Sequence, residues 1–187
     1  ATGKLRLGLG FQHANLWDRD HQLTLQYITN PENVNKVTVL GAGYHIPLYE
    51  RGDSIDFVMG YSDVDSGVVQ QLFNVSGAGL IMLGRYNLNL KRIEDYEHKV
   101  VFGLDYKAFQ SRVLTTSGIS LVPDITLHPA SLGYAGELRD EKNSVNFYTK
   151  LSYNAFQGGT AAKQSDLKAA LVSASGAPAE YFHWQAG

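Results

Sequence analysis

Apolar and polar residues alternate with a period of two along most of this chain. From Lys4 to Gln12, large apolar residues occupy every second position, and polar residues or glycines stand between them. Successive side chains of a β-strand point to opposite faces, so this pattern predicts a strand with one apolar and one polar face. The same alternation recurs at 22–27, 54–61, 80–89, 99–107 and 145–153, and less regularly at 36–46 and 127–138. We expect about eight strands, with the start of a ninth at Tyr181–Trp184.

The predicted connections between strands also alternate in length, because each short polar turn is followed by a longer link. The short turns are 18–21, 49–53, 91–95 and 139–143, and the longer links are 30–35, 63–76, 109–123 and 156–178. Outer-membrane β-barrels sort their connections in this way, with tight periplasmic turns and long outside loops. Several alternating runs extend over about 10 to 13 residues, which is enough for a tilted strand to cross a bilayer. Within the last link, Ser165–Leu171 has the residues of a short helical turn.

Composition narrows the function classes. The 187 residues contain no cysteine, which excludes disulfide scaffolds and thiolate metal sites. The 16 basic residues nearly balance the 18 acidic ones, so we expect no nucleic-acid partner. A charged fraction of 18% with 19 glycines and 11 tyrosines suits β-structure beside lipid. No apolar run is long enough for a transmembrane helix, and the start has no secretory signal, so any signal has been removed or lies outside this chain.

Many tyrosines cluster near the predicted strand ends, where a ring can lie in lipid and its hydroxyl in the headgroup zone. They are Tyr27, Tyr44, Tyr61, Tyr86, Tyr96, Tyr106, Tyr134, Tyr148 and Tyr153. Ordinary packing in a soluble β-core is the alternative explanation for each of them.

Candidate catalytic and metal sites find little support, and we expect no enzymatic activity, no cofactor and no metal. The six histidines have no metal-ligand spacing. Asp18, Asp20 and His21 are better explained as a solvated turn than as a cation site. Asp63–Gly67 resembles the opening of a calcium loop but lacks the later ligands. Gly8–Gly10 and Gly77–Gly79 lack the third glycine and the helix of a nucleotide site.

The polar positions of the strands are the more informative set. If the apolar residues contact lipid, a lipid-facing Arg or Lys at the midplane would cost about 2–4 kcal/mol, so the charged residues must face a lumen. The predicted lumen-facing residues are Arg6, Gln12, Asp56, Arg85, Lys99, Asp105, Lys107, Glu137 and Lys150. A lumen of mixed charge suits an unfolded polypeptide that passes through, although these groups could also simply solvate a pore or pair with one another.

Several local patterns resemble outer-membrane transporters. Gly43–Leu48, followed by Gly52 and Asp53, resembles the Tyr-x-x-Pro-Leu turn of the haemolysin secretion and activation transporters, the outer-membrane half of two-partner secretion. Asn15–Asp20 resembles the Asn-aromatic-Gly turn of related barrels, with aspartate where glycine is usual. Further matches follow in the family's order, namely Arg85 with Leu88 and Leu90, His98–Lys107, Leu132–Gly136 and Asn154–Gly159. The resemblance covers nearly the whole chain.

This resemblance implies an all-β, antiparallel up-and-down transmembrane β-barrel of about sixteen strands in the outer membrane of a Gram-negative bacterium. Residues 1–187 are then expected to form a partial barrel domain of about eight to nine consecutive strands, without the family's periplasmic domains and the second half of its barrel. The implied partners are the lipid bilayer and a secreted polypeptide of the haemolysin or adhesin type. Open sheet edges are not tolerated in lipid, so an isolated fragment should either pair with another copy of itself or fail to insert.

Two alternatives remain open at this point. The chain could be a complete small β-barrel that binds a ligand, like a lipocalin, with its apolar face turned inward. It could also be a small structural outer-membrane barrel of about eight strands without a transport role.

Overall fold

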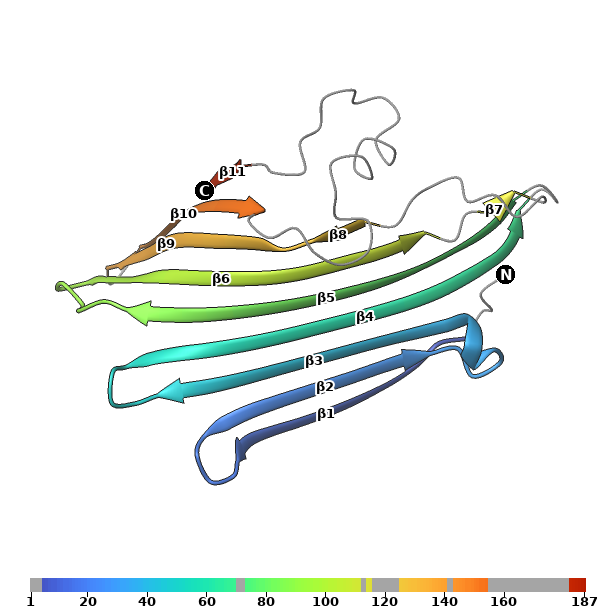
Figure 1. Ribbon diagram of the computed structural model, residues 1–187. Helices are drawn as coiled ribbons and strands as arrows, with labels where there is room; N and C mark the ends of the chain where they lie inside the picture. Colours follow the sequence, from blue (N-terminus) through green and yellow to red (C-terminus); the bar gives the residue numbers. More distant parts are fainter. Residues whose placement is uncertain (1–4, 70–72, 112–113, 116–124, 141–142, 155–181) are drawn as a thin grey trace.

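A single antiparallel β-sheet makes up the computed structural model of this protein (Figure 1). The structure describes residues 5–69, 73–111, 114–115, 125–140, 143–154 and 182–187. The long strands are β1 (Leu7–Leu16), β2 (His21–Thr29), β3 (Val37–Leu48), β4 (Asp53–Val69), β5 (Phe73–Asn89), β6 (Tyr96–Ser111), β9 (Pro129–Arg139) and β10 (Ser144–Asn154). The shorter elements are β7 (Leu114–Thr115), β8 (Ile125–Leu127), β11 (Phe182–Ala186) and the 3-10 helix η1 (Val34–Lys36). The predicted all-β, antiparallel class is confirmed.

The strands follow one another as a meander. Their order across the sheet is β1-β2-β3-β4-β5-β6-β9-β10-β11, while the short β7 and β8 pair with β5 and β6. β1 and β11 lie at opposite edges (Figure 1), and no cross-strand pair joins these two strands in the part of the chain that the structure describes. The sheet is therefore not closed.

Each predicted stretch corresponds to a strand over most of its length, although β1 begins only at Leu7, Lys36 belongs to η1, and His128 separates β8 from β9. The expected ninth strand corresponds to β11. The main difference is strand length. β4 and β5 have 17 residues each and β6 has 16, against about 5 or 6 in ordinary globular proteins. The predicted link 63–76 is wrong over its described part, because β4 runs to Val69 and β5 begins at Phe73. Backbone pairing continues there through residues that do not alternate between apolar and polar types. Ser165–Leu171, expected to be helical, lies outside the described residues.

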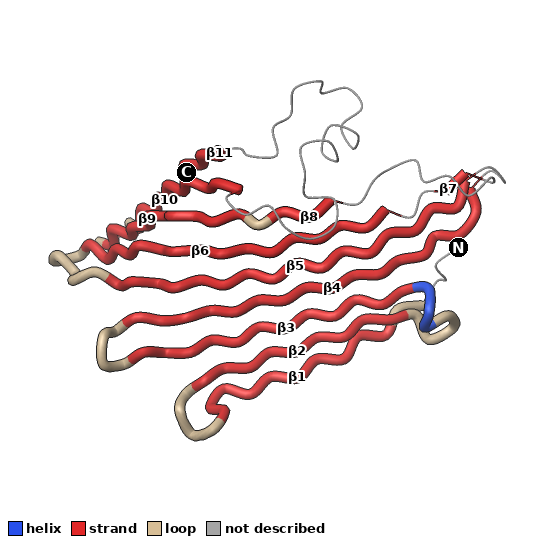
Figure 2. Tube along the Cα trace, in the orientation of Figure 1, coloured by secondary structure: helices blue, strands red, loops and turns tan. Residues whose placement is uncertain are grey.

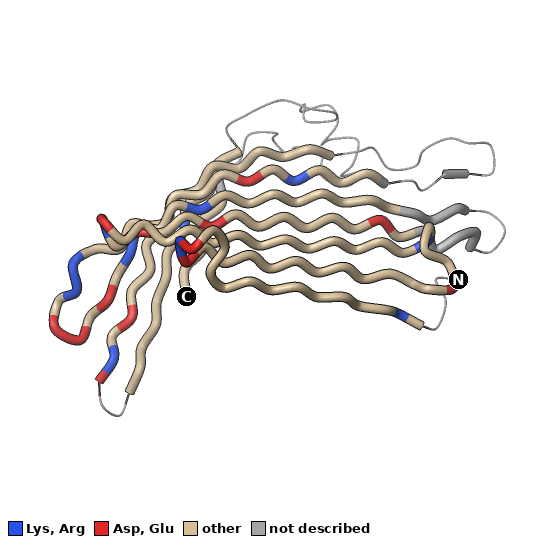
Figure 3. The backbone as a smooth tube through the Cα atoms, turned by 90° about the horizontal axis from the view of Figure 1, so that it is seen from below, with Lys and Arg blue, Asp and Glu red and all other residues tan. Residues whose placement is uncertain are grey.

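The short turns between strands lie at one end of the sheet. The turns β1–β2, β3–β4, β5–β6 and β9–β10 gather at one end, on the left of Figure 1, which we call the turn end. At the other end, which we call the loop end, η1 lies between β2 and β3, and β4, β6 and β10 have their last residues. Figure 3 shows that the sheet is bent rather than flat, with most of the charged residues near the turn end.

The first turn shows why aspartate replaces the glycine that the resemblance led us to expect. Trp17, Asp18 and Asp20 have φ angles of 65°, 53° and 56°, in the left-handed region. Aspartate and asparagine tolerate this conformation better than other non-glycine residues. The Asn15 side chain accepts the Asp20 backbone N–H at 2.8 Å and donates to the Asp18 carboxylate at 3.4 Å. These local hydrogen bonds hold the turn in place of glycine.

The sheet has no hydrophobic core in the usual sense. Val37 is the only buried hydrophobic side chain among the described residues. The strands form one layer, with no second sheet or α-helix against either face over the described ranges (Figure 2). None of the described helical residues belongs to a helix long and apolar enough to cross a membrane. Whatever covers the apolar side chains must come from outside the described part of the chain.

Candidate functional site: the two faces of the sheet

Cross-strand pairing places every predicted polar position on the same face, which we call the polar face. In β4 and β5, for example, Asp56 is paired with Arg85, while the neighbouring pair of Phe57 and Gly84 belongs to the opposite, apolar face. Adjacent side chains alternate between faces, so the register carries this assignment across the sheet. The strand residues with polar-face parity include Gln12, Asp56, Arg85, Lys99, Asp105, Lys107, Glu137 and Lys150, and Arg6 has the same parity just before β1.

An ion-pair group occupies the polar face of β5 and β6. The Arg85 guanidinium donates to the Asp105 carboxylate, and the Lys107 ammonium lies 3.3 Å from the other carboxylate oxygen. The Asp105 side chain is 4% exposed and that of Arg85 is 21% exposed. Gly103 makes room for this arrangement, because a Cβ there would lie 2.8 Å from the guanidinium. One carboxylate thus holds two cations.

A second group lies beside the first and extends it across β3 and β4. His45 Nδ1 lies 2.6 Å from the Asp56 carboxylate, which also accepts a hydrogen bond from the Asn87 side chain at 2.5 Å. The Asn87 amide also donates to the Ser54 hydroxyl at 3.1 Å. Together the two groups form a band of paired polar side chains across β3 to β6. Most of its charge is therefore balanced within the protein.

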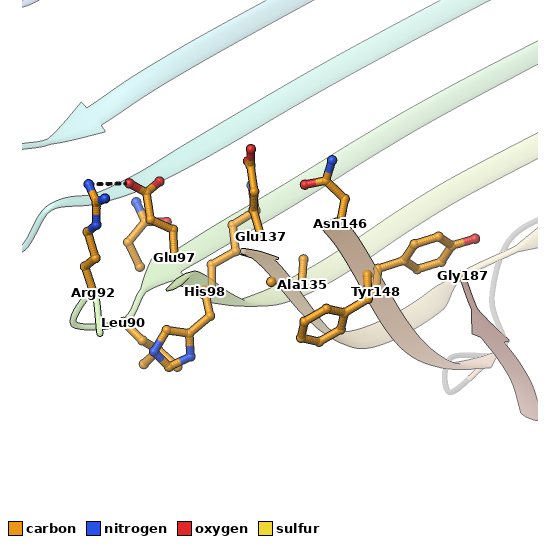
Figure 4. Close-up of a pocket in the computed structure, with 13 residues that line it drawn as sticks. Leu90, Arg92, Glu97, His98, Ala135, Glu137, Asn146, Tyr148 and Gly187 are labelled. Atoms are coloured by element: carbon orange, nitrogen blue, oxygen red, sulfur yellow. Dashed lines mark ion pairs between the residues drawn. The ribbon is translucent and has the colours of Figure 1, made fainter. Parts of the chain in front are cut away.

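At the turn end, the polar face contains a cavity of about 720 Å³ between β5, β6, β9, β10 and the last residue. Glu97 and Glu137 are directly opposed across β6 and β9. Arg92 lies 3.1 Å from Glu97, and Arg139 lies 2.7 Å from Glu137, so each carboxylate has its own cation. In Figure 4 the two glutamates extend to one side of the strands and His98 to the other.

The predicted polar residues therefore divide into four sets. Arg85, Asp105 and Lys107 come together, Asp56 joins the adjacent group, and Lys99 and Glu137 line the cavity. Arg6 just before β1, Gln12 in β1 and Lys150 in β10 belong to none of these groups. Three further polar-face residues, His45, Asn87 and Glu97, were not among the lumen-facing residues predicted from the sequence. Their strand parity was a usable signal, but their partners depend on the register between strands.

The apolar face differs from the polar face because its large side chains are exposed and uncharged. Its large side chains are open, as the 60% exposure of Leu9, 50% of Phe57, 46% of Met82 and 64% of Leu104 shows. On β4, Asp53 and Asp63 have the parity of this face, and no described Asp, Glu, Lys or Arg side chain of this parity lies between them or at the matching levels of the neighbouring strands. Contiguous apolar surface of this kind marks contact with a membrane, a ligand or another protein.

Tyrosines border the apolar face, and their hydroxyls contact polar groups near the strand ends. Three pairs lie toward the turn end and one toward the loop end. Tyr44 lies 2.7 Å from His21 Nδ1, Tyr86 donates to Asp53 at 2.5 Å, Tyr134 lies 2.9 Å from His98 Nδ1, and Tyr61 donates to Asp63 at 3.3 Å. Each ring thus packs on the apolar face while its hydroxyl is bonded toward the strand end.

Aromatic side chains also fill the space above one glycine of this face. Tyr96 and Phe147 are stacked with their ring centroids 6.0 Å apart. A Cβ on Gly136 would lie 2.5 Å from the Tyr96 hydroxyl and 2.6 Å from the Phe147 ring. The absence of a side chain at Gly136 therefore leaves room for the two rings.

A hydrogen bond joins the first two turns of the turn end to each other. The Tyr49 hydroxyl donates to the Asp20 carboxylate at 2.9 Å, which links the first two turns of the turn end. This hydrogen bond, with burial and the nearby negative charge, raises the pKa of Tyr49 above its ordinary value of 10.0. Asp18 accepts a hydrogen bond from Asn15, and Asp20 accepts one from Tyr49. No group of three potential metal ligands occurs over the described ranges.

Comparison with known proteins identified no family for this chain. A scan against protein-family models, a search of curated proteins and a search of solved structures returned no match to this chain.

Proposed function

We propose that this sheet is part of the wall of an outer-membrane β-barrel, with its apolar face against lipid and its polar face lining the lumen. The barrel exports a polypeptide of the haemolysin or adhesin type, as the outer-membrane partner of a two-partner secretion system.

One observation carries the proposal: the apolar face is continuous and uncharged between the borders that Asp53 and Asp63 mark on β4, and the charged strand residues of the central region share the opposite face. Exposed apolar surface costs about 25 cal/mol for each Å² in water, so a monomer in water would be strongly disfavoured with this face open. Lipid removes that cost without a second protein layer. The polar face needs water instead, because turning Arg85 or Lys107 toward lipid at the midplane would cost about 2–4 kcal/mol.

The proposed substrate class rests on two further points. The band of paired polar groups on β3 to β6 presents little uncompensated charge, so an unfolded chain could slide past it without strong attachment. The turn motifs at Asn15–Asp20 and Gly43–Leu48 resemble those of the haemolysin secretion and activation transporters, which move such substrates. Folding of the substrate outside the cell would favour net export.

A second candidate function is binding of an apolar ligand by a small closed barrel. Two cavities, of about 450 and 430 Å³, lie mainly among apolar-face side chains and share Ala42 and Met59. If the apolar face turned inward, they would become part of a ligand cavity. Such a protein would be a stable monomer in water without detergent.

The test is to disrupt the gene in the bacterium that makes this protein and to compare the polypeptides in the culture medium by mass spectrometry. The export proposal expects one large polypeptide to disappear from the medium and to accumulate in the periplasm, and wild-type protein should restore it. An unchanged medium with altered permeability of the outer membrane to small solutes would favour a structural barrel. Recovery of the protein as a soluble monomer would favour the ligand-binding alternative.

A further inference from the structure

Six tyrosines of the apolar face form two oblique rows, while Tyr27, which is level with Tyr61, and Tyr96 belong to neither row. The turn-side row consists of Tyr44 in β3, Tyr86 in β5 and Tyr134 in β9. Cross-strand pairs show how these residues lie relative to one another. Tyr86 lies two residues nearer to the turn end than the position level with Tyr44, and Tyr134 lies two residues nearer again than the position level with Tyr86. Each step of two residues spans two strands.

The loop-side row repeats this displacement. Through the cross-strand pairs, Tyr61 in β4 is level with Ala108 in β6, but Tyr106 lies two residues nearer to the turn end than Ala108. Tyr153 in β10 is level with Leu104, two residues nearer again. Both rows therefore shift by one residue for every strand crossed, in the same direction.

The polar partners of the turn-side row follow the same line. His21, Asp53 and His98 are hydrogen-bonded to Tyr44, Tyr86 and Tyr134 in turn. On the strand register, Asp53 lies two residues nearer to the turn end than the position level with His21, and His98 two residues nearer than the position level with Asp53. The boundary between apolar and polar side chains is thus itself oblique to the strands.

This slope converts into an angle. A strand rises about 3.3 Å per residue, and neighbouring strands lie about 4.8 Å apart. A shift of one residue per strand places each row at roughly 35° to the perpendicular of the strands. Transmembrane β-strands are tilted by about 35–45°, so rows that lie level in a membrane should have this slope on the sheet.

The width of the apolar band agrees with the same orientation. On β4, the band lies between Asp53 and Asp63, about 33 Å apart along the strand at the usual rise. With a tilt of roughly 35°, this corresponds to about 27 Å along the membrane normal, close to the roughly 25 Å apolar band of outer-membrane barrels.

We propose that the two tyrosine rows contact the two headgroup layers of one bilayer, so that the strands cross the membrane inclined by roughly 35°. The inference rests on the proposed membrane function and adds which residues lie at equal depth. Tyr61 and Tyr153 lie at one depth although they are four register positions apart. Phe57 and Tyr153 share a register level but differ in depth.

Depth measurement by spin labels distinguishes these arrangements. The chain has no cysteine, so Phe57→Cys, Tyr61→Cys and Tyr153→Cys each give one labelling position. The full chain, labelled and reconstituted into phosphatidylcholine vesicles, should place positions 61 and 153 at the same depth. Position 57 should lie about 5 Å deeper, because it is about 11 Å from the nearer border of the apolar band, at Asp53, whereas position 61 is about 5 Å from the border at Asp63.

Equal depths at positions 57 and 153 would mean upright strands and would overturn the inference, while the membrane proposal would stand. Labels that never enter the lipid would overturn both. A second measurement needs no substitution: polarised infrared dichroism of the unmodified protein in oriented bilayers should give a strand tilt of roughly 35°. Strands parallel to the membrane normal would again overturn the inference.

Discussion

The two faces of the sheet are built from alternate residues of the same strands, yet they are held together in different ways. On the polar face, side chains pair across strands, as Arg85 does with Asp105 and His45 with Asp56. On the apolar face, polar contacts are confined to the border, at pairs such as Tyr86 with Asp53. This difference shows that strand parity determines the face on which a side chain lies, while the register between strands determines which partner it contacts.

The strongest test of this contrast places a charge on each face at neighbouring positions. Met82 is exposed on the apolar face, and Leu83 lies on the polar face directly opposite Asp105. In lipid vesicles, Met82→Arg should lower the free energy of unfolding by about 2–4 kcal/mol, because its guanidinium would face hydrocarbon. Leu83→Arg is the matched control and should cost far less. Equal losses in urea unfolding, followed by tryptophan fluorescence, would contradict the contrast.

A smaller effect is expected when an ion pair of the polar face is broken. Asp105→Asn leaves Arg85 and Lys107 without their shared carboxylate and should cost about 1.5–3 kcal/mol of unfolding free energy. The control is Glu97→Gln, whose pair with Arg92 is solvent-exposed and should contribute at most about 1 kcal/mol. A double-mutant cycle of Asp105→Asn with Arg85→Met measures the coupling. Coupling near zero would show that the pair does not hold β5 to β6.

Glycine substitutions test whether the faces differ in packing. Gly136→Ala would push a Cβ into the Tyr96 and Phe147 rings on the apolar face and should cost about 1–2 kcal/mol. Gly60 lies on the polar face, and a Cβ there would meet nothing within 4 Å. Gly60→Ala should therefore leave the urea midpoint nearly unchanged. The packing argument fails if the two substitutions have the same effect.

The smallest expected effect on stability concerns the hydrogen bond between Tyr49 and Asp20 at the turn end. Tyr49 donates to Asp20, and its pKa is raised because an ionised phenol would lose that hydrogen bond and face a carboxylate. The stabilising contribution is present below pH 10.0, the ordinary value, and is lost as pH rises through the raised pKa of the folded protein.

Difference absorbance between the wild type and Tyr49→Phe should therefore show Tyr49 ionising above pH 10.0. Asp20→Asn should bring that ionisation back toward the ordinary value. Ionisation of Tyr49 at the ordinary pH in the wild type would show that the bond between the turns does not form in solution.

Much of the sheet follows from local pattern, because burial on one face imposes a period of two. This is why the parity of Leu7, Asp56 and Lys99 could be predicted. The pattern was weaker in β3, where Gly41 and Gly43 on the polar face carry no side chain to mark it.

Partners could not be predicted in the same way. His45 meets Asp56 only because the β3–β4 turn fixes the register of two strands, and no single-strand pattern contains that information. The extension of β4 to Val69 was missed for a related reason, since ladder hydrogen bonds need no alternation of side chains.

The most direct test of the central claim is a scan of spin-labelled single cysteines along β5, from residue 80 to residue 87, in lipid vesicles. Each label is exposed to oxygen, which concentrates in hydrocarbon, and to a nickel chelate, which remains in water. The account predicts that labels at even positions, such as Met82, collide mainly with oxygen and those at odd positions, such as Arg85, mainly with nickel. Even positions shielded from both reagents would reveal a sealed apolar interior and contradict it.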